Sequence, residues 1–407
     1  MQPSVSVTGL GIVSPFGTSC DAFRDAILEG RSAIAPIEKF DTTGCASRLA
    51  AIVTGFEPTA FVPPMKLRRM DPTGVYAVAA ARMALDDARQ PLDSDGTDAG
   101  GMVLGTWSAG GQAMQEYLAA LFRSGPIGVP ALIFNTTVGN AAASHVGLEF
   151  KLRGPNTTIT HKEASGLAAV VSAVEFVRQG RASWLVTGGV DSVYELFFKA
   201  HDRFAAMSRR PSFSAGIGPF DRDRCGFVMG EGCFALHLEP ADRVLERDVT
   251  PYGEIVGVAA SGAAVSINAW PDRAEPLMRT MTLALADAGM DARDVDVVYA
   301  SANGTPQLDA VEGLALVELF GKRRTVITSI KGAVGECGAS GAASCVAALL
   351  CGRAHRVPPV AGLATVDPAL ESLHVATASI AAPGPIVLVN SFASGGALFS
   401  VVLRVAV

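Results

Sequence analysis

The sequence predicts an α/β protein made of two similar halves, in which helices cover both faces of the sheet. Two observations predict this class. Short apolar runs typical of buried strands alternate along the chain with longer segments of helical hydrophobic spacing. The same order of elements occurs twice, and the second pass begins after Tyr252. Alternating strands and helices favour βαβ units, whose sheets are buried on both faces.

The first half begins with an apolar strand at residues 4–13, which ends in the turn Ser14-Pro15-Phe16-Gly17. Further strands are predicted where apolar residues run between Gly or Pro, and helices where Ala-rich segments follow a capping residue. The predicted elements are a helix at 20–29, an irregular stretch at 30–64, a helix from about 69 to 88, a strand at 101–105, helices at 112–122 and 134–145 (the second capped by Asn) and a strand at 183–189.

A strand–turn–helix segment at 157–175 organises the first half. The β-branched run 157–160 predicts the end of a buried strand, and a turn of small residues at 164–166 leads into an apolar helix. The turn places Glu163 at a helix N-terminus, where free backbone N–H groups favour an anion or a polarised acyl oxygen. A nucleophile often occupies such a place, but here the residue is a carboxylate.

The second half repeats this plan. Its predicted strands and helices lie at 253–262, 274–289, 295–302, 308–320, 326–330, 338–350, 386–390 and 401–405. Each half has a strand that turns into a helix rich in Ala, Ser and Gly, at 157–175 and at 326–350. We therefore predict two duplicated halves, 1–251 and 252–407, that form one compact unit with a site where their helix N-termini converge. The alternative is ordinary α/β periodicity without duplication.

Composition excludes several classes of protein. The 407 residues are 49% hydrophobic and 18% charged, which fits large cores and an obligate oligomer. The net charge of −6 and the absence of a Lys/Arg run argue against nucleic-acid binding. No apolar run reaches the ~18 residues of a membrane span, and no basic segment precedes a signal-like run. The seven scattered Cys form no CxxC pair, so we expect neither zinc nor disulfides, and a cytoplasmic location.

Seven stretches, in order along nearly the whole chain, resemble the β-ketoacyl synthases of the thiolase superfamily. They are VTGLGIVSPFG at 7–17, KLRGPNTTIT with the following turn at 151–166, GGVDS at 188–192, PFDRDRCGFVMGEG at 219–232, NGTPQLDAVE at 303–312, SIKGAVGECGASGAAS at 329–344 and NSFASGG at 390–396. The resemblance implies a thiolase-like fold of five layers, αβαβα, in a dimeric protein. It also implies work on acyl groups carried by acyl carrier proteins.

The same resemblance implies that condensation is lost. Working members of the family use a Cys at the elbow, where strand turns into helix, and two His residues that assist decarboxylation of a malonyl extender and stabilise the enolate. Here those positions hold Glu163, Asn303 and Glu336, whereas the family's Lys is kept as Lys331. Ser394 replaces a Phe in the C-terminal glycine turn. No catalytic residue, cofactor or metal is therefore expected in this chain.

The chemistry of these residues agrees. A carboxylate in place of the thiolate would give a reactive mixed anhydride, and an ionised Glu336 accepts hydrogen bonds but donates none. Asn303 retains an N–H, and one such donor is typically worth ~10²–10³ in rate. Glu163 and Glu336 are then either structural fillers or a coupled pair, for which we predict that Lys331 lies between the two carboxylates. His161 offers a further partner for Glu163.

A ketosynthase-like chain without a nucleophile resembles the chain-length factor, or β subunit, of type II polyketide synthases. Such subunits pair with a catalytic ketosynthase, and residues at the interface close the tunnel that receives the growing chain. The carrier protein that delivers the chain bears phosphopantetheine. The resemblance places the tunnel gate on the helix after Gly110-Gly111, at Gln112, Met114, Tyr117 and Leu118. It places interface contacts at Asn135, Thr137, Asn140, Thr158 and Thr160.

Three functions follow from this resemblance. The first is a chain-length factor for a polyketide or a polyene; those subunits often carry Gln at the elbow, and the departure to Glu163 favours the polyene branch. The second is a decarboxylase that makes primer from malonyl-carrier protein, with Asn303 as the surviving donor. The third is a homodimeric, inactive ketosynthase homologue with a structural role.

Overall fold

The computed structural model describes residues 3–213, 216–321 and 323–406. The first half comprises β1 (Val5–Val13), α1 (Cys20–Leu28), β2 (Ile34–Pro36), β3 (Leu49–Ala51), α2 (Pro64–Leu67), α3 (Pro72–Asp87), β4 (Gly100–Gly105), α4 (Gly111–Ser124), α5 (Ala131–Phe134), α6 (Ala141–Glu149), β5 (Asn156–Ile159), α7 (Ser165–Arg178), β6 (Trp184–Asp191), α8 (Glu195–Arg203), β7 (Met229–Gly230), β8 (Gly232–Pro240) and α9 (Ala241–Arg247). Short 3-10 turns lie at Pro58–Ala60, Pro126–Gly128, Lys162–Ala164 and Pro368–Leu370.

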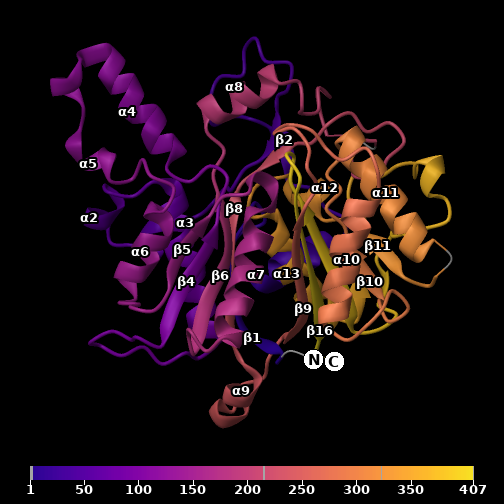
Figure 1. Ribbon diagram of the computed structural model, residues 1–407. Helices are drawn as coiled ribbons and strands as arrows, with labels where there is room; N and C mark the ends of the chain where they lie inside the picture. The colour runs from indigo at the N-terminus through magenta and orange to yellow at the C-terminus, as the bar shows by residue number, and fades with distance from the viewer. Residues whose placement is uncertain (1–2, 214–215, 322, 407) are drawn as a thin grey trace.

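The second half comprises β9 (Gly253–Gly262), α10 (Glu275–Asp287), β10 (Val297–Tyr299), α11 (Pro306–Phe320), β11 (Val326–Thr328), α12 (Lys331–Val334), α13 (Ser340–Arg353), β12 (Arg356–Val357), β13 (His374–Val375), β14 (Ile380–Ala381), β15 (Ile386–Phe392) and β16 (Ala397–Val405). Figure 1 shows the second half, in orange and yellow, beside the first half in indigo and magenta. The predicted strands and helices occur in the predicted order in both halves, apart from the segments described below, and the structure adds elements that were not predicted, among them α8, β8, α9 and α12.

The strand pairing confirms the duplication. In the first half the order β1-β8-β6-β4-β5 has two antiparallel pairings followed by two parallel ones. The order β9-β16-β15-β10-β11 of the second half has the same pattern, with β13 added beyond β11. Three antiparallel residue pairs between β1 and β9 join the two sets into one 11-stranded hydrogen-bonded sheet.

Helices complete the five layers expected of a thiolase-like fold (Figure 1). Helices α3 and α6 pack on the outer face of the first set of strands, and α10 and α11 on that of the second. Helices α7 and α13 pack against each other and against strands of both sets, so they form the middle layer. Every residue of α13 from Ser340 to Cys351 is buried, and its Ala, Gly and Ser side chains allow this close packing on all sides.

Glycines in β1 let α3 lie directly on the sheet. A Cβ added to Gly11 would lie 1.9 Å from the carbonyl oxygen of Ala80, and one added to Gly9 would lie 2.1 Å from that of Ala84. The facing side of α3 is correspondingly rich in alanine. The sequence pattern of a Gly-containing strand followed by an Ala-rich helix therefore encodes this contact.

Three local predictions are wrong. Residues 134–145 do not form one Asn-capped helix; α5 ends at Phe134, α6 begins at Ala141, and the Asn140 side chain makes no capping hydrogen bond. Strand β5 is only half buried, because it forms an edge of the large sheet. The stretch 30–64, predicted to be irregular, contains β2 and β3, which form a small sheet with β7.

The side of the molecule that carries β5 is unusually apolar at its surface. Helices α4 and α5 project there from the body of the protein (Figure 1). Phe122 is 84% exposed, Ile127 is 100% exposed, and Leu132 and Phe134 are also exposed. In the described part of the chain, no helix combines the length and the hydropathy required to cross a membrane.

Candidate functional site

The elbow that precedes α7 is built by short-range hydrogen bonds. After β5 the chain makes a 3-10 turn at Lys162–Ala164 and enters α7 at Ser165. Ser165 Oγ accepts a hydrogen bond from the His161 N–H at 2.8 Å and donates one to the Lys162 carbonyl at 2.7 Å. The Gly166 N–H donates to the Gly338 carbonyl at 2.6 Å, so the start of α7 lies against the segment that opens α13. The predicted convergence of helix N-termini is confirmed.

Glu163 is buried at this elbow. The residue is 4% exposed, and its Oε1 accepts a hydrogen bond from Ser394 Oγ at 3.0 Å. The Ser394 N–H donates to Oε2 at 3.2 Å. Burial and, after it, the nearby charge of Glu336 raise the pKa of Glu163 from 4.5 to about 7, against the lowering effect of Ser394 and Lys162. Glu163 is therefore partly protonated at neutral pH.

Glu336 has a separate set of partners. Its Oε2 accepts hydrogen bonds from Lys331 Nζ at 2.7 Å and from Asn303 Nδ2 at 2.8 Å, and its Oε1 accepts one from the Cys337 N–H at 3.1 Å. Lys331 Nζ also donates to the Ser301 carbonyl at 2.7 Å. The prediction that Lys331 lies between the two carboxylates is wrong, because its ammonium pairs with Glu336 and the turn at Ser394 supplies the donors to Glu163.

Asn303 is held in place by the same network. Its Nδ2 donates to Glu336, and its Oδ1 accepts from the Thr305 N–H at 2.9 Å. Two buried carboxylates on α11 fix the backbone on either side. Asp309 accepts from the Asn303 and Gly304 N–H groups, and Glu312 from those of Ser301 and Ala302.

The roles of Asp309 and Glu312 were not predicted from the sequence. Burial raises the pKa of Asp309 to about 6 and that of Glu312 to about 7. The signal for them was present, since both are acidic residues on the apolar helix 308–320 at positions that face the core.

A cavity of about 330 Å³ opens beside Glu163. Aromatic side chains dominate its lining, and Glu163 supplies the carboxylate. The lining comprises Trp107, Lys162, Glu163, His201, Phe204, Ala206, Phe227, Asn268, Trp270, Thr305 and Ser394. The lining contains no cysteine and does not include Asn303, Lys331 or Glu336. His161 is exposed, its ring lies 5.4 Å from that of Phe399, and it makes no hydrogen bond to Glu163 in the described residues.

The four predicted gate residues do not share one cavity. Gln112 lines a cleft of about 550 Å³ between α3 and the first turns of α4. Met114 is exposed, the Tyr117 ring packs on Phe134 with 5.9 Å between centroids, and Leu118 is half-buried. Of the four, only Gln112 belongs to the lining of this cleft.

The predicted interface residues lie on the side that carries β5. Thr158 is in β5 and Thr160 directly follows it, with Thr158 half-buried and Thr160 exposed. The Thr158 Oγ1 is buried without a hydrogen-bond partner in the described structure. Asn135 and Asn140 are exposed in the connection between α5 and α6, whereas Thr137 is buried and donates to the Phe134 carbonyl at 2.8 Å.

The described residues contain no group of three or more His, Cys, Asp or Glu side chains arranged to hold a metal ion. The lining of the elbow cavity offers the carboxyl group of Glu163, the side chains of Lys162 and His201, and an aromatic wall. Such a cavity can accept an apolar group and a hydrogen-bond donor, but it presents no thiolate.

Comparison with known proteins matches this geometry to one family. Residues 2–243 match the β-ketoacyl synthase N-terminal domain, and residues 252–364 match the C-terminal domain. The chain is 30% identical over 397 residues to 3-oxoacyl-[acyl-carrier-protein] synthase 2 of a Synechocystis species, covering 96% of this chain and 95% of that one. It is 34% identical over 375 residues to the tetracenomycin polyketide synthase ketoacyl synthase beta subunit of Streptomyces glaucescens, covering 90% of each.

Solved structures agree. The ishigamide ketosynthase/chain length factor superposes with a TM-score of 0.92 at 28% identity, over 100% of both chains. A second structure is AntDE:AntF, a type II polyketide synthase acyl-carrier protein in complex with its hexaketide-bound ketosynthase. One of its chains superposes with a TM-score of 0.90 at 25% identity, over 100% of both chains. With a thiolase-like fold, an elbow between β5 and α7 and both domains of the family matched in order, this chain belongs to the β-ketoacyl synthase family.

Proposed function

We propose that this chain is a chain-length factor, a non-condensing subunit that pairs with a catalytic ketosynthase and shapes the tunnel for a growing polyketide or polyene chain. One observation carries the proposal: the elbow presents the carboxyl group of Glu163, in a cavity whose lining has no thiol. An acyl chain cannot be held there as a thioester. The nucleophile must therefore come from another polypeptide.

The two other positions support the same conclusion. Glu336 is an acceptor that is already bonded to Lys331 and Asn303, so it does not donate to an enolate oxygen. Cys337 directly follows Glu336 in the sequence. Burial raises the pKa of its thiol, and its sulfur accepts a hydrogen bond from the Ser340 hydroxyl. It lies outside the cavity lining and cannot replace the missing nucleophile.

The surface supports pairing with another chain. Strand β5 is an edge strand, and edge strands that are not covered readily pair with another polypeptide. On the same side of the molecule, the projecting α4–α5 segment exposes Phe122, Ile127 and Leu132, and apolar surface of this kind marks protein–protein interfaces. The proposed interface contacts are Asn135, Thr137, Asn140, Thr158 and Thr160. A second copy of this chain would bring no thiol at its elbow, so the partner is a ketosynthase that retains its cysteine.

Relatedness alone does not select this function, because the chain is about equally similar to condensing synthases and to a ketosynthase β subunit. The residue at the elbow separates the two. The complex of a relative with an acyl-carrier protein supports carrier-delivered substrates for the heterodimer as well. The proposed carrier bears the phosphopantetheine, and this subunit needs no cofactor of its own.

The structure gives less support to the other two functions. A decarboxylase would use Asn303 as a donor to the enolate, but Asn303 does not line the elbow cavity and its amide is bonded to Glu336 and Thr305. A homodimeric scaffold would need no partner with a cysteine, so the oligomeric state in the presence of a ketosynthase distinguishes it from our proposal. Release of CO₂ from malonyl-carrier protein by the purified chain alone would favour the decarboxylase over our proposal.

The proposal is tested by reconstitution with a ketosynthase that has an intact Cys-His-His set and is encoded beside this chain. We expect product from the two proteins together with malonyl-carrier protein, and none from either protein alone. Mass spectrometry should find the acyl adduct on the partner. An acyl adduct on the wild-type form of this chain would overturn the proposal, and Glu163→Cys provides the positive control because it restores a thiol at the elbow.

A further inference from the structure

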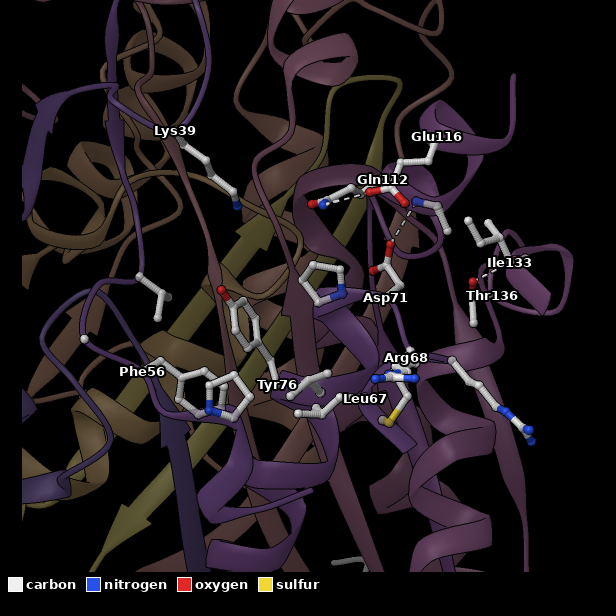
Figure 2. Close-up of a pocket in the computed structure, with 18 residues that line it drawn as sticks. Lys39, Phe56, Leu67, Arg68, Asp71, Tyr76, Gln112, Glu116, Ile133 and Thr136 are labelled. Atoms are coloured by element: carbon white, nitrogen blue, oxygen red, sulfur yellow. Dashed lines mark hydrogen bonds between the residues drawn. The ribbon is translucent and has the colours of Figure 1, made fainter. Parts of the chain in front are cut away.

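A second cavity, the α4 cleft, lies away from the elbow. It has a volume of about 550 Å³, which is within the range of small-molecule sites. Figure 2 shows its lining, with Phe56, Leu67 and Tyr76 on one side and Gln112 and Glu116 of α4 on another. Its lining shares no residue with that of the elbow cavity. A ligand in this cleft would therefore not be one attached at Glu163.

Two polar atoms in the cleft, the Tyr76 hydroxyl and Gln112 Oε1, lack hydrogen-bond partners among the described residues. Tyr76 is 8% exposed, and its hydroxyl makes no hydrogen bond to any described residue although it points into the cleft (Figure 2). Burial raises the pKa of Tyr76, so the hydroxyl stays protonated and can donate. The Oε1 of Gln112 is buried without a hydrogen-bond partner, while its Nε2 contacts Glu116 Oε1 at 3.3 Å. The buried Gln112 Oε1 costs free energy while it lacks a partner, and a bound ligand can recover that cost.

Two charged groups inside the cleft, Lys39 and Asp71, already have partners. Lys39 Nζ pairs with the buried Glu231 at 3.0 Å. Asp71 accepts hydrogen bonds from the Thr73 N–H and hydroxyl and from the Ala113 N–H, which ties the start of α4 to the start of α3. Arg68 and Arg69 are exposed at the rim. The interior thus favours an uncharged ligand that is mostly apolar and carries oxygen substituents.

The position of the cleft indicates where such a ligand comes from. Ile133 and Thr136 of the α5 region form part of the wall, and α4 forms another part. Both segments belong to the side of the molecule where β5 and the exposed apolar side chains lie (Figure 1). A chain held by a partner on this side can reach the cleft without passing through the core of this subunit.

We infer that the α4 cleft receives the free end of the acyl chain attached to the partner ketosynthase, and that Tyr76 and Gln112 hydrogen bond to hydroxyl groups near that end. This inference rests on the proposed function. A hydroxyl group can accept from the Tyr76 hydroxyl and donate to the Gln112 carbonyl oxygen, whereas an alkyl end leaves both atoms without partners. The substrate class is therefore an oxygenated acyl chain, and Tyr76 and Gln112 are specificity residues.

Binding to the purified chain tests the inference without any partner. The probes are a medium-chain acyl N-acetylcysteamine thioester with a terminal hydroxyl and the matched thioester with a terminal methyl. We expect the hydroxyl probe to bind about tenfold more tightly in calorimetry. Tyr76→Phe and Gln112→Leu should each reduce this preference. Tyr252→Phe, a tyrosine variant outside the lining, should keep it. Equal affinity for the two probes, or an unchanged preference in both cleft variants, would overturn the inference.

Reconstitution separates this inference from the proposed function. With a competent ketosynthase, Tyr76→Phe and Gln112→Leu should change the length or the terminal oxygenation of the product. If the wild-type proteins make product together and both variants give the same products as the wild type, the proposed function stands and the inference fails. If no ketosynthase pairs with this chain, the proposed function fails. The inference about the source of the ligand then fails as well, even if the purified chain prefers the hydroxyl probe to the methyl probe.

Discussion

Lys331 Nζ donates a 2.7 Å hydrogen bond to Glu336 Oε2, and both side chains are almost completely buried. Asn303 adds a second donor to the same oxygen, so the charge of Glu336 is compensated inside the protein. Glu163 has no cation among its hydrogen-bond partners in the described structure and is bonded to Ser394 instead. The two carboxyl groups that replace catalytic residues thus differ in their environment, and each leads to a separate prediction.

Replacing Lys331 with Met should destabilise the protein strongly. The variant leaves Glu336 buried without its cation, and breaking a buried ion pair in this way typically costs about 3–5 kcal/mol. The measurement is the free energy of unfolding in denaturant. Lys66→Met is the matched control, because Lys66 pairs with Glu149 at the surface and such pairs are worth about 1 kcal/mol or less. Equal stability of Lys331→Met and the wild type would show that the buried pair has no structural role.

Glu163→Gln should change how stability depends on pH. The pKa of Glu163 is raised from 4.5 in the unfolded chain to about 7 in the folded protein. The folded protein then binds a proton that the unfolded chain releases, so this group stabilises the protein fully below pH 4.5 and loses that contribution as pH rises to 7. Gln keeps an oxygen for Ser394 and does not titrate.

The measurement is the difference in unfolding free energy between Glu163→Gln and the wild type at pH 4.5 and at pH 8. We expect the variant to gain about 3 kcal/mol relative to the wild type over this range, at about 1.4 kcal/mol per pH unit. Asp309 and Glu312 titrate in the same range, so only the difference between the two proteins isolates Glu163. Glu175→Gln, which changes a half-exposed carboxylate on α7, is the matched control.

The sequence predicted the elements whose signal is local. The strand at 4–13, the elbow at Glu163 and the small-residue helices predicted within 157–175 and at 338–350 follow from spacing within one segment, and the structure contains them as β1, the elbow, α7 and α13. The partners of Glu163 could not be predicted in this way, because Ser394 is far from it in sequence and only the antiparallel pairing of β15 with β16 brings that turn to the elbow. The exposure of β5 was missed for a similar reason, since strand composition does not reveal which strand lies at the edge of a sheet.

The α4 cleft could not be predicted either. It depends on the contact between α3 and α4, which Asp71 makes by accepting a hydrogen bond from the Ala113 N–H at 3.1 Å. No pattern within α4 alone indicates that Gln112 faces a cavity while Met114 faces solvent. The resemblance to chain-length factors pointed to α4, but only the structure shows which residues of this helix face the cleft.

Phe122→Asp should weaken pairing with the ketosynthase. Phe122 is 84% exposed on α4, next to the other apolar side chains of the proposed interface. A carboxylate there would be desolvated in the complex without a partner, which is unfavourable. The measurement is co-purification with a tagged ketosynthase, followed by analytical ultracentrifugation. Leu245→Asp is the matched control: Leu245 is 85% exposed on α9, at another end of the molecule (Figure 1). Pairing that is reduced equally by both variants would argue against this interface.

Leu118→Ala should lengthen the product of the reconstituted heterodimer. Leu118 is half-buried on α4, and Met114, one turn earlier, is exposed on the side proposed to meet the partner. Removing the three distal carbons of Leu118 opens space along the proposed tunnel, so the chain can extend before it meets the wall. Mass spectrometry of the released products measures the length. Leu314→Ala, at an exposed leucine on α11 in the other half, should leave the products unchanged. If neither Leu118→Ala nor Met114→Ala shifts the distribution, the gate does not include these two residues, and Gln112 and Tyr117 remain as candidates from the predicted set.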